Sequence, residues 1–214
     1  MRVSIIIPTK DEPNVQELVD EVNRELRNVK HEVIVVDKSE RDLKLRGANV
    51  LKQRSKGLAK AIIEGIENAK YDRVIVMDGD FSHDPRDVKK LLNVLKHSDL
   101  VIGSKYVKGA RDESPLSRKL ISRTANLLAK FLLGFKVKDC ISGFFGFKKV
   151  RGIKLRGVGF KLSTELLFKL KGKAKVEEVP INFRKRKYGR SKFSLLEIFK
   201  FLILLVRLRF KLFT

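Results

Sequence analysis

Short apolar runs rich in β-branched residues alternate with helical segments along the first half of the chain. Three runs have the pattern of a strand buried on both faces, namely VSIIIP at 3–8, EVIVVD at 32–37 and RVIVMD at 73–78. Between them, residues 14–29 and 57–69 carry apolar side chains at helical spacing. This alternation predicts an α/β fold, with a mainly parallel central sheet flanked by helices on both faces.

The remaining sequence adds further elements. Residues 84–96 are expected to form a helix, with Asp84 as its N-cap and Pro85 at its first position. Other segments are assigned by the same periodicities: strands at 99–104, 142–149 and 174–183, and helices at 114–134 and 163–171. At 214 residues the chain is expected to form one domain with an appendage.

The positive charge is concentrated in the second half. Residues 1–107 carry 20 Lys and Arg against 18 Asp and Glu, whereas residues 108–214 carry 28 against 7, so that half holds +21 of the net +23. Such a field attracts nucleic acid, anionic lipid or phosphorylated substrates. Abundant lysine with only two glutamines, Gln16 and Gln53, favours a thermophilic source.

Cysteine and hydropathy bear on the compartment. Cys140 is the only cysteine, so no disulfide framework is expected, and no Cys/His cluster has zinc spacing. The apolar run before Pro8 is too short for a signal peptide, and no segment offers about 20 uncharged residues for a membrane span. We therefore expect a cytoplasmic protein that does not cross a membrane.

Asp78 and Asp80 lie one residue apart, where the third apolar run ends. Ligands of open α/β sheets bind beyond the carboxyl ends of strands, where Asp37 and the turn at residues 8–12 are also expected. Two carboxylates beside a rigid strand suit one hard cation, Mg²⁺ or Mn²⁺, that bridges to a substrate diphosphate. The alternative is that both are solvated turn residues.

Five segments resemble, in order and spacing, the inverting family-2 glycosyltransferases with a GT-A fold. They are VSIIIPTKDE (3–12), VIVVD (33–37), VMDGDFSHDP (76–85), VIGSKYVKG (101–109) and EVPINFRKRKYGRSK (178–192). Within that family, the chain is most similar to the dolichol-phosphate and polyprenyl-phosphate mannose synthases. The resemblance implies a GT-A catalytic domain over residues 1–192, followed by a C-terminal segment over residues 193–214.

For the donor, the resemblance implies that Asp78 and Asp80 bind Mg²⁺ or Mn²⁺ against the diphosphate of a nucleotide sugar, with Asp80 also counted as catalytic. The residues it places at the nucleotide are Pro8, Asp11, Glu12 and Asp37. The metal would act as a Lewis acid on the leaving diphosphate. Lys38 stands where the family often has a second acid, and residues 54–61 have fewer glycines than the family's glycine-rich motif. Donor identity is therefore less well defined than reaction type.

For the acceptor, the resemblance implies a lipid phosphate, which is already ionised and needs cations more than a strong base. Residues 117–128 match the family's acceptor-loop helix and residues 184–192 its late basic loop. The candidates they offer are Arg118, Lys119, Arg123, Asn126, Arg184, Arg186 and Lys192. Of these we take Arg118, Arg123, Arg186 and Lys192 as catalytic residues that hold the acceptor. The alternative for each arginine is an exposed solubilising charge.

Three other side chains have two interpretations each. Asp139 matches an acid that orients the acceptor or acts as a base, and it is counted as catalytic; the alternative is an ion pair with a neighbouring lysine. Glu165 matches a glutamate that faces the site, or it forms a buried ion pair. His83 is expected to be a solvated turn histidine rather than a metal ligand.

The apolar segment at 193–214 is interrupted by four cations, and its longest charge-free run has six residues, 201–206. Lys200, Arg207 and Lys211 share one side of a helix, which predicts an amphipathic helix on an anionic membrane surface. The alternative is packing against the sheet or a second subunit.

Together these features predict a metal-dependent inverting transferase, peripheral to the cytoplasmic face of the membrane. It would move a hexose, mannose from GDP-mannose, onto a polyprenyl or dolichyl phosphate, with UDP-glucose as the alternative donor. A nucleic-acid-binding module would also explain the charge, but it leaves Asp37, Asp78 and Asp80 without a role, so no nucleic acid is expected.

Overall fold

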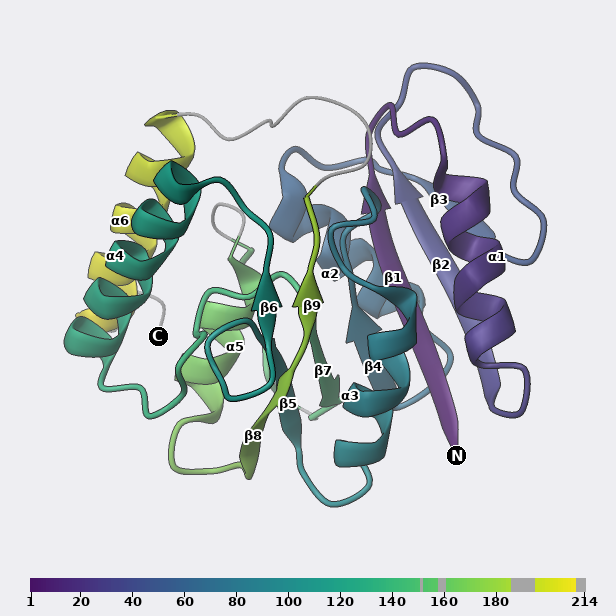
Figure 1. The fold of residues 1–214 in the computed structure, drawn as a ribbon. Coiled ribbons are helices and arrows are strands. Elements are labelled where there is room, and N and C mark those ends of the chain that lie inside the picture. The colour runs from purple at the N-terminus through teal and green to yellow at the C-terminus, as the bar shows by residue number, and fades with distance from the viewer. Residues whose placement is uncertain (151, 158–160, 186–194, 211–214) are drawn as a thin grey trace.

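A seven-stranded sheet forms the centre of the molecule in the computed structural model, which describes residues 1–150, 152–157, 161–185 and 195–210 (Figure 1). Its strand order is β3-β2-β1-β4-β7-β5-β8. The strands are β1 (Arg2–Thr9), β2 (Lys30–Asp37), β3 (Asn49–Lys52), β4 (Arg73–Val76), β5 (Leu100–Ser104), β7 (Phe145–Lys148) and β8 (Val176–Pro180). Only β7 among the described strands of this sheet runs antiparallel to its neighbours, which confirms the mainly parallel sheet.

The continuous apolar runs follow from burial on both faces. Every β1 side chain from Val3 to Thr9 is buried, because helices cover both sides of the strand. One face is covered by α1 (Val15–Glu25) and α3 (Val88–Val94). The other is covered by α2 (Leu58–Asn68), α5 (Leu162–Leu170) and α6 (Leu195–Arg209), with α4 (Leu116–Leu133) beside α6. Two apolar cores result, one on each face.

The structure refines several expected elements. Asp84 is a cap as predicted, since its carboxylate accepts a hydrogen bond from the Arg86 N–H, but it caps the short 3₁₀ turn η1 (Pro85–Asp87) that leads into α3. The expected strand at 174–183 divides into β8 and β9 (Asn182–Phe183). β9 pairs with β6 (Arg111–Asp112) in a separate two-stranded sheet. Neither β3 nor β6 was expected from the sequence.

The C-terminal helix α6 buries one face. Phe201, Leu204, Leu205 and Leu208 belong to the core that α4 and α5 also line, so this face packs on the protein, as the alternative interpretation held. The boundary expected at residues 192 and 193 lies outside the described residues and stays a prediction. None of the helices in the described part of the chain combines the length and the apolar character needed to cross a bilayer.

Candidate active site

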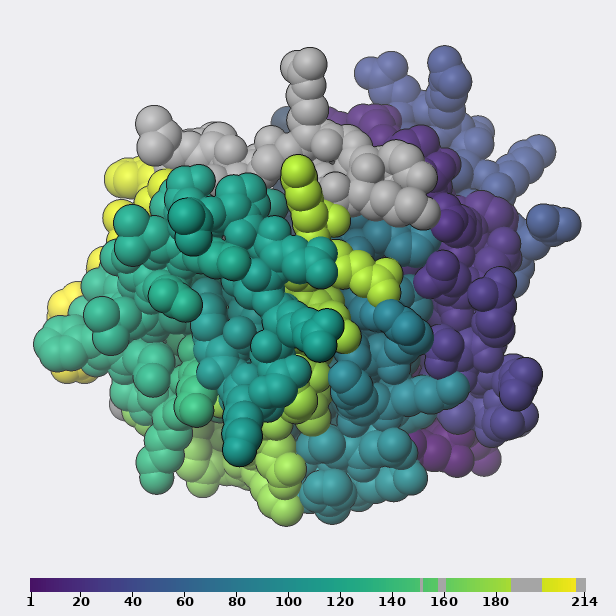
Figure 2. Space-filling view, viewed as in Figure 1, coloured from purple at the N-terminus to yellow at the C-terminus, as the bar shows by residue number. Residues whose placement is uncertain are grey.

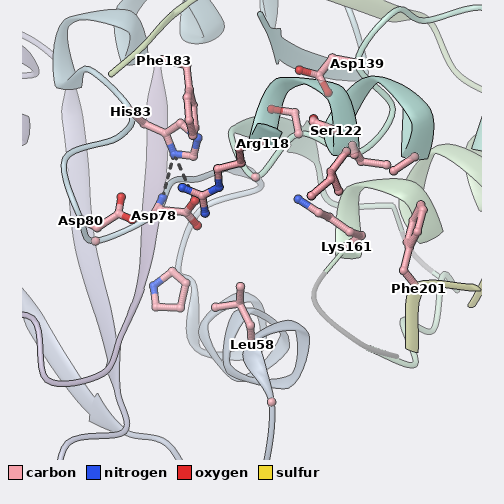
Figure 3. Close-up of a pocket in the computed structure, with 18 of the residues that line it drawn as sticks. Leu58, Asp78, Asp80, His83, Arg118, Ser122, Asp139, Lys161, Phe183 and Phe201 are labelled. Carbon is pink, nitrogen blue, oxygen red and sulfur yellow. Dashed lines mark hydrogen bonds and ion pairs between the residues drawn. The ribbon is translucent and has the colours of Figure 1, made fainter. Parts of the chain in front are cut away.

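A cavity of about 920 Å³ opens beyond the carboxyl ends of β1 and β4, where the ligand site of an α/β sheet is expected (Figure 3). One part of its wall is charged: Asp78, Asp80, Lys105, Arg118, Asp139 and Lys161. Another part is apolar and comes from α2, α4 and α6: Leu58, Ala61, Leu120, Ile121, Leu128, Phe201 and Leu202. A single cavity therefore joins a charged region to an apolar one.

The two predicted metal ligands follow β4 in a tight turn. The Asp80 carboxylate accepts hydrogen bonds from the Ser82 N–H at 3.0 Å and from the Ser82 hydroxyl at 2.5 Å. Phe81, which lies between Asp80 and Ser82, has a φ of 61°, a left-handed conformation that non-glycine residues seldom adopt. A Cβ at Gly79 would lie 2.7 Å from Thr9 Cγ2, so glycine lets the turn pack against the end of β1.

His83 is buried, which corrects the expectation of a solvated histidine. Its ring stacks on Phe144 with centroids 4.9 Å apart and meets the edge of Phe183 at 5.5 Å. Its Nδ1 accepts a hydrogen bond from the Asp78 N–H at 3.0 Å, so the ring proton resides on Nε2 (Figure 3). Burial lowers the pKa of His83, although the nearby charges of Asp78 and Asp80 oppose this effect. The neutral ring therefore supports the backbone of the turn that carries Asp78 and Asp80.

The donor set at this turn suits a hard cation. Across the described residues, no three His, Cys, Asp or Glu side chains gather as a metal site. Asp78 and Asp80 both line the cavity, and Mg²⁺ is commonly held by one or two carboxylates together with substrate phosphates and water. The residues therefore fit a cation that shares its coordination with a bound diphosphate.

The predicted nucleotide residues separate into two groups. Pro8 and Glu12 line the cavity, together with Lys38 and Gln53, which the sequence did not single out as nucleotide ligands. Asp37 and Asp11 do not line it. The Asp37 Oδ1 atom accepts hydrogen bonds from Thr9 and Ser39, and Ser39 in turn accepts one from the Asp11 N–H. Within the described part of the chain, the buried Asp37 Oδ2 atom has no hydrogen-bond partner.

Of the predicted acceptor arginines, the structure brings Arg118 into the cavity. Arg123 lies exposed on α4, and neither Arg123 nor Lys119 lines the cavity. Arg184 pairs with Asp84 at 2.5 Å instead. Arg186 and Lys192 lie outside the described residues, so their acceptor role, like that of Arg123, stays a prediction.

Asp139 is buried at the cavity wall and joins two elements. Its carboxylate accepts hydrogen bonds from the Lys105 N–H at 3.3 Å and from the Asn126 side chain on α4 at 3.4 Å. Burial raises the pKa of Asp139, although the charges of Lys105 and Lys161 and these hydrogen bonds oppose the effect. Asn126 thus holds Asp139 rather than lining the cavity.

Glu165 faces the protein interior, as the buried ion-pair alternative held. It accepts hydrogen bonds from the Arg156 and Gly157 N–H groups and pairs with Lys169 at 3.3 Å.

Lys105 and Lys161 are cavity lysines that the sequence interpretation missed. Lys105 lies 4.6 Å from the centroid of the Phe183 ring and 3.8 Å from Asp112. Lys161 precedes α5 and is directed into the cavity (Figure 3). Burial lowers the pKa of Lys161 to about 8; Asp78 and Asp139 oppose this effect, whereas Lys105 and Arg118 add to it.

Comparisons with known proteins agree with this geometry. The model of "Glycosyl transferase family 2" matches residues 4–150. The dolichol-phosphate mannosyltransferase of Pyrococcus furiosus is 38% identical over 226 residues, covering 97% of this chain and 64% of the relative, so the chain spans less than two thirds of that relative. The undecaprenyl-phosphate mannosyltransferase of Micrococcus luteus is 34% identical, covering 91% of this chain and 88% of the relative.

Solved structures confirm the expected GT-A fold. Glucosyl-3-phosphoglycerate synthase from Mycobacterium tuberculosis, in complex with Mn²⁺, UDP and phosphoglyceric acid, superimposes with a TM-score of 0.74 at 19% identity. The match covers 97% of this chain and 78% of that one. With the family model matching most of the chain and relatives of more than 30% identity covered over most of their length, this protein belongs to glycosyl transferase family 2.

Proposed function

We propose that the protein is a metal-dependent inverting transferase that moves mannose from GDP-mannose onto a polyprenyl phosphate at the cytoplasmic face of the membrane. The observation that carries this proposal is the composition of the cavity. Acids suited to a metal and a diphosphate, cations suited to an acceptor phosphate, and an apolar wall all line the same space. A lipid phosphate needs both the cations, which bind its phosphate, and the apolar wall, which contacts its hydrocarbon chain.

The donor side is assigned by position. Pro8, Glu12 and Lys38 line the cavity near Asp78 and Asp80, where a nucleoside diphosphate would reach the metal. Mannose is supported by the curated relatives, which are named as mannosyltransferases. UDP-glucose is the second candidate, because Lys38 departs from the family's acidic residue and a structural neighbour is described in complex with UDP.

The transfer requires one bond to form as another breaks. An acceptor phosphate oxygen attacks the anomeric carbon on the face opposite the diphosphate, and the sugar–diphosphate bond breaks with its electron pair leaving on the nucleoside diphosphate. Because the acceptor oxygen is already ionised, no side chain has to remove a proton from it. When bound, the cation would supply Lewis-acid stabilisation of the leaving diphosphate. Arg118 and Lys105 would hold the acceptor phosphate in line, which lowers the entropic cost of the reaction.

Membrane attachment is supported by the exposed faces of two neighbouring helices. On α4, four large apolar residues are between 68% and 84% exposed: Leu116, Leu120, Leu127 and Phe131. On α6, Phe199, Leu202 and Val206 are exposed beside Lys200, Arg207 and Arg209. Apolar residues flanked by cations are typical of helices that lie in an anionic interface. We call the exposed residues of α4 and α6 the lipid face; the cavity opens beside it, since Leu120 and Leu202 line both.

The proposal is tested with the purified full chain, undecaprenyl phosphate in detergent, and radiolabelled GDP-mannose or UDP-glucose, each with Mn²⁺ or with EDTA. We expect a mannosyl lipid from GDP-mannose with Mn²⁺ and none with EDTA. Transfer from UDP-glucose alone would establish the second donor. Absence of transfer from both donors, with binding of neither nucleotide, would contradict the proposal.

A further inference from the structure

Lys161 is held rigidly against the cavity by the first turn of α5. The Ser163 hydroxyl donates to the Ser142 carbonyl at 2.7 Å, and the Thr164 hydroxyl donates to the Cys140 carbonyl at 2.9 Å. Both hydroxyl groups belong to residues with no measurable exposure. These bonds fasten the start of α5 to residues 139–143, a segment from which Asp139, Ile141, Ser142 and Gly143 line the cavity. The position of Lys161 is therefore set by buried structure on its C-terminal side.

The electrostatic surroundings of Lys161 favour an anion in the cavity. Its ammonium shares the charged wall with two other cations, Lys105 and Arg118, and with Asp78 and Asp139 (Figure 3). Placing three cations together at a partly desolvated wall is unfavourable unless anions balance them. Asp139 already accepts two hydrogen bonds, and Asp78 is expected to bind the metal. Once a cation occupies the acidic turn, this part of the wall keeps an excess of positive charge even with Asp112 3.8 Å from Lys105, and such a wall suits an anionic ligand.

We propose that Lys161 is a catalytic residue that binds a phosphate oxygen of the acceptor, together with Arg118. This inference rests on the proposed function and extends it to a residue that neither the sequence interpretation nor the comparisons assign. Figure 3 shows the Lys161 ammonium directed toward Arg118, across the cavity from Asp80. The side chain comes from the α5 side of the cavity, whereas on the expected nucleotide side Pro8 lies near the end of β1 and Glu12 follows that strand. A lysine offers a compact charge with three donors, which complements the planar fork of an arginine on one phosphate.

The test compares Lys161→Met with Lys173→Met in the full chain, using calorimetric binding of farnesyl phosphate, farnesol and GDP with Mn²⁺. Lys173 is exposed beyond the end of α5, so its substitution removes the same charge from the same part of the chain. We expect Lys161→Met to bind farnesyl phosphate at least about tenfold more weakly, since a hydrogen bond to a charged group contributes about 1.5–3 kcal/mol. Farnesol and GDP binding should change less than about twofold, which corresponds to under about 0.4 kcal/mol, and Lys173→Met should match the parent.

Each other outcome has a distinct meaning. Parental farnesyl phosphate binding by Lys161→Met would overturn the inference and leave the proposed function standing. Equal losses of GDP and farnesyl phosphate binding would also overturn it, because Lys161 would then act on the donor side. If the parent itself binds farnesyl phosphate no better than farnesol, the proposed acceptor is wrong, and the inference falls with it. Should Lys161→Met fail to fold, Lys161→Gln, which keeps a polar end, is measured by the same comparison.

Discussion

The turn that carries Asp78 and Asp80 depends on contacts made by its own residues. The Asp80 carboxylate accepts two hydrogen bonds from Ser82, and these bonds close the turn around Phe81, which has a left-handed conformation. The His83 Nδ1 atom accepts a hydrogen bond from the Asp78 N–H. Strained conformations persist only where the surrounding structure enforces them. The hydrogen bonds of Asp80 and the buried His83 supply that enforcement, and they leave the carboxylates at the cavity.

Asp80→Asn separates the charge of this residue from its structural role. The amide oxygen retains an acceptor for Ser82, but the negative charge for the metal is lost. We expect transfer to fall by about a hundredfold or more, as when a group that stabilises developing charge is removed. The melting temperature should stay within about 4 °C of the parent, the shift for roughly 1 kcal/mol or less. Asp72→Asn, an exposed acid before β4, is the control, and near-parental transfer by Asp80→Asn would exclude Asp80 as a metal ligand.

The role of His83 is tested by two substitutions. His83→Phe keeps a ring against Phe144 but removes the acceptor for the Asp78 N–H, whereas His83→Asn offers an acceptor without the full ring. We expect His83→Phe to weaken Mn²⁺ binding, followed by electron paramagnetic resonance, by about fivefold, the equivalent of one hydrogen bond of about 1 kcal/mol. His83→Asn should recover part of this loss. If both variants weaken binding in proportion to their loss of stability, His83 only supports the fold.

Cys140 illustrates a residue whose chemistry is suppressed by its surroundings. It is fully buried, and burial raises the pKa of its thiol to about 12, with the charge of Asp139 adding to the effect. Because the thiolate is the reactive form, we expect no reaction with a disulfide reagent at pH 8 in the folded protein. One equivalent should react after unfolding in guanidinium chloride. Rapid labelling of the native protein would show that α4 and α5 open at Cys140.

The site residues that were predicted differ from those that were missed in one respect. Asp78, Asp80, Pro8 and Glu12 form short patterns at strand ends, and all four line the cavity. Lys161 stands alone in a chain with 48 Lys and Arg, so no local pattern distinguishes it from a surface charge. Its significance depends on α5 packing against residues 139–143, which is a tertiary contact. For the same reason the sequence could not show that Asp37 stays beside the cavity.

At the scale of elements, the predictions were most accurate for segments whose continuous apolar sequence matches burial on both faces. The runs that form β1, β2 and β4 were recognised because both faces of each strand are covered. β3 was missed because its four residues are at most half-buried at the edge of the sheet. β7 pairs antiparallel with β4, a direction that is set by tertiary pairing. Within β7, Gly146 lets Leu95 and Ile75 approach to within about 3 Å of where a Cβ would lie. Such close packing has no periodic signal.

The ion pair between Asp84, which caps η1, and Arg184, which follows β9, predicts that the free energy of unfolding depends on pH. Burial alone would raise the pKa of Asp84, but hydrogen bonds from Arg86 and the charge of Arg184 outweigh it and lower the pKa below its ordinary value. A depressed pKa in the folded state stabilises the protein above the unfolded value, about pH 3.9, and this stabilisation is lost as the pH falls through the lower folded value. We therefore expect Asp84→Asn to cost on the order of 1–3 kcal/mol at pH 7 and much less near pH 2.

Urea unfolding of the parent and of Asp84→Asn from pH 7 to pH 2 measures this effect. Asp42→Asn is the matched control, because Asp42 is 91% exposed and its pair with Lys52, at 3.6 Å, should contribute little. A free-energy difference between the parent and Asp84→Asn that stays constant down to pH 2 would contradict the assignment.

At the scale of the whole molecule, the basic half of the sequence and the lipid face coincide. Figure 2 shows the purple and blue-violet atoms of the first residues on the right, and the green-teal and yellow atoms that include α4 and α6 on the left. That second half carries a net charge of +21, and it contains α4 and α6. Since one face of α6 is part of the core, deleting this helix would damage the fold as well as any membrane contact. Surface substitutions on α4 are the cleaner test.

The last prediction therefore concerns Leu127→Ser combined with Phe131→Ser. Both side chains are more than two-thirds exposed, and neither lines the cavity, so the fold and the donor site should be unaffected. Burying these two side chains in a lipid interface would contribute up to about 1.5–3 kcal/mol each. We expect binding to vesicles of phosphatidylglycerol and phosphatidylcholine, measured by sedimentation, to fall by about tenfold or more. Raising the salt concentration should weaken the parent further, because the cations beside the apolar residues contribute by charge.

Val150→Ser is the control for this experiment, since Val150 is an exposed apolar residue outside α4 and α6. It should bind vesicles as the parent does. Equal binding by the double variant and the parent would mean that α4 does not enter the interface. Loss of self-association with unchanged vesicle binding would instead show that Leu127 and Phe131 contact a second copy of the chain. Because a lipid acceptor has to enter the cavity beside Leu120 and Leu202, an α4 that loses membrane contact should also lower transfer to undecaprenyl phosphate in vesicles. Transfer to farnesyl phosphate in solution should remain near the parental rate.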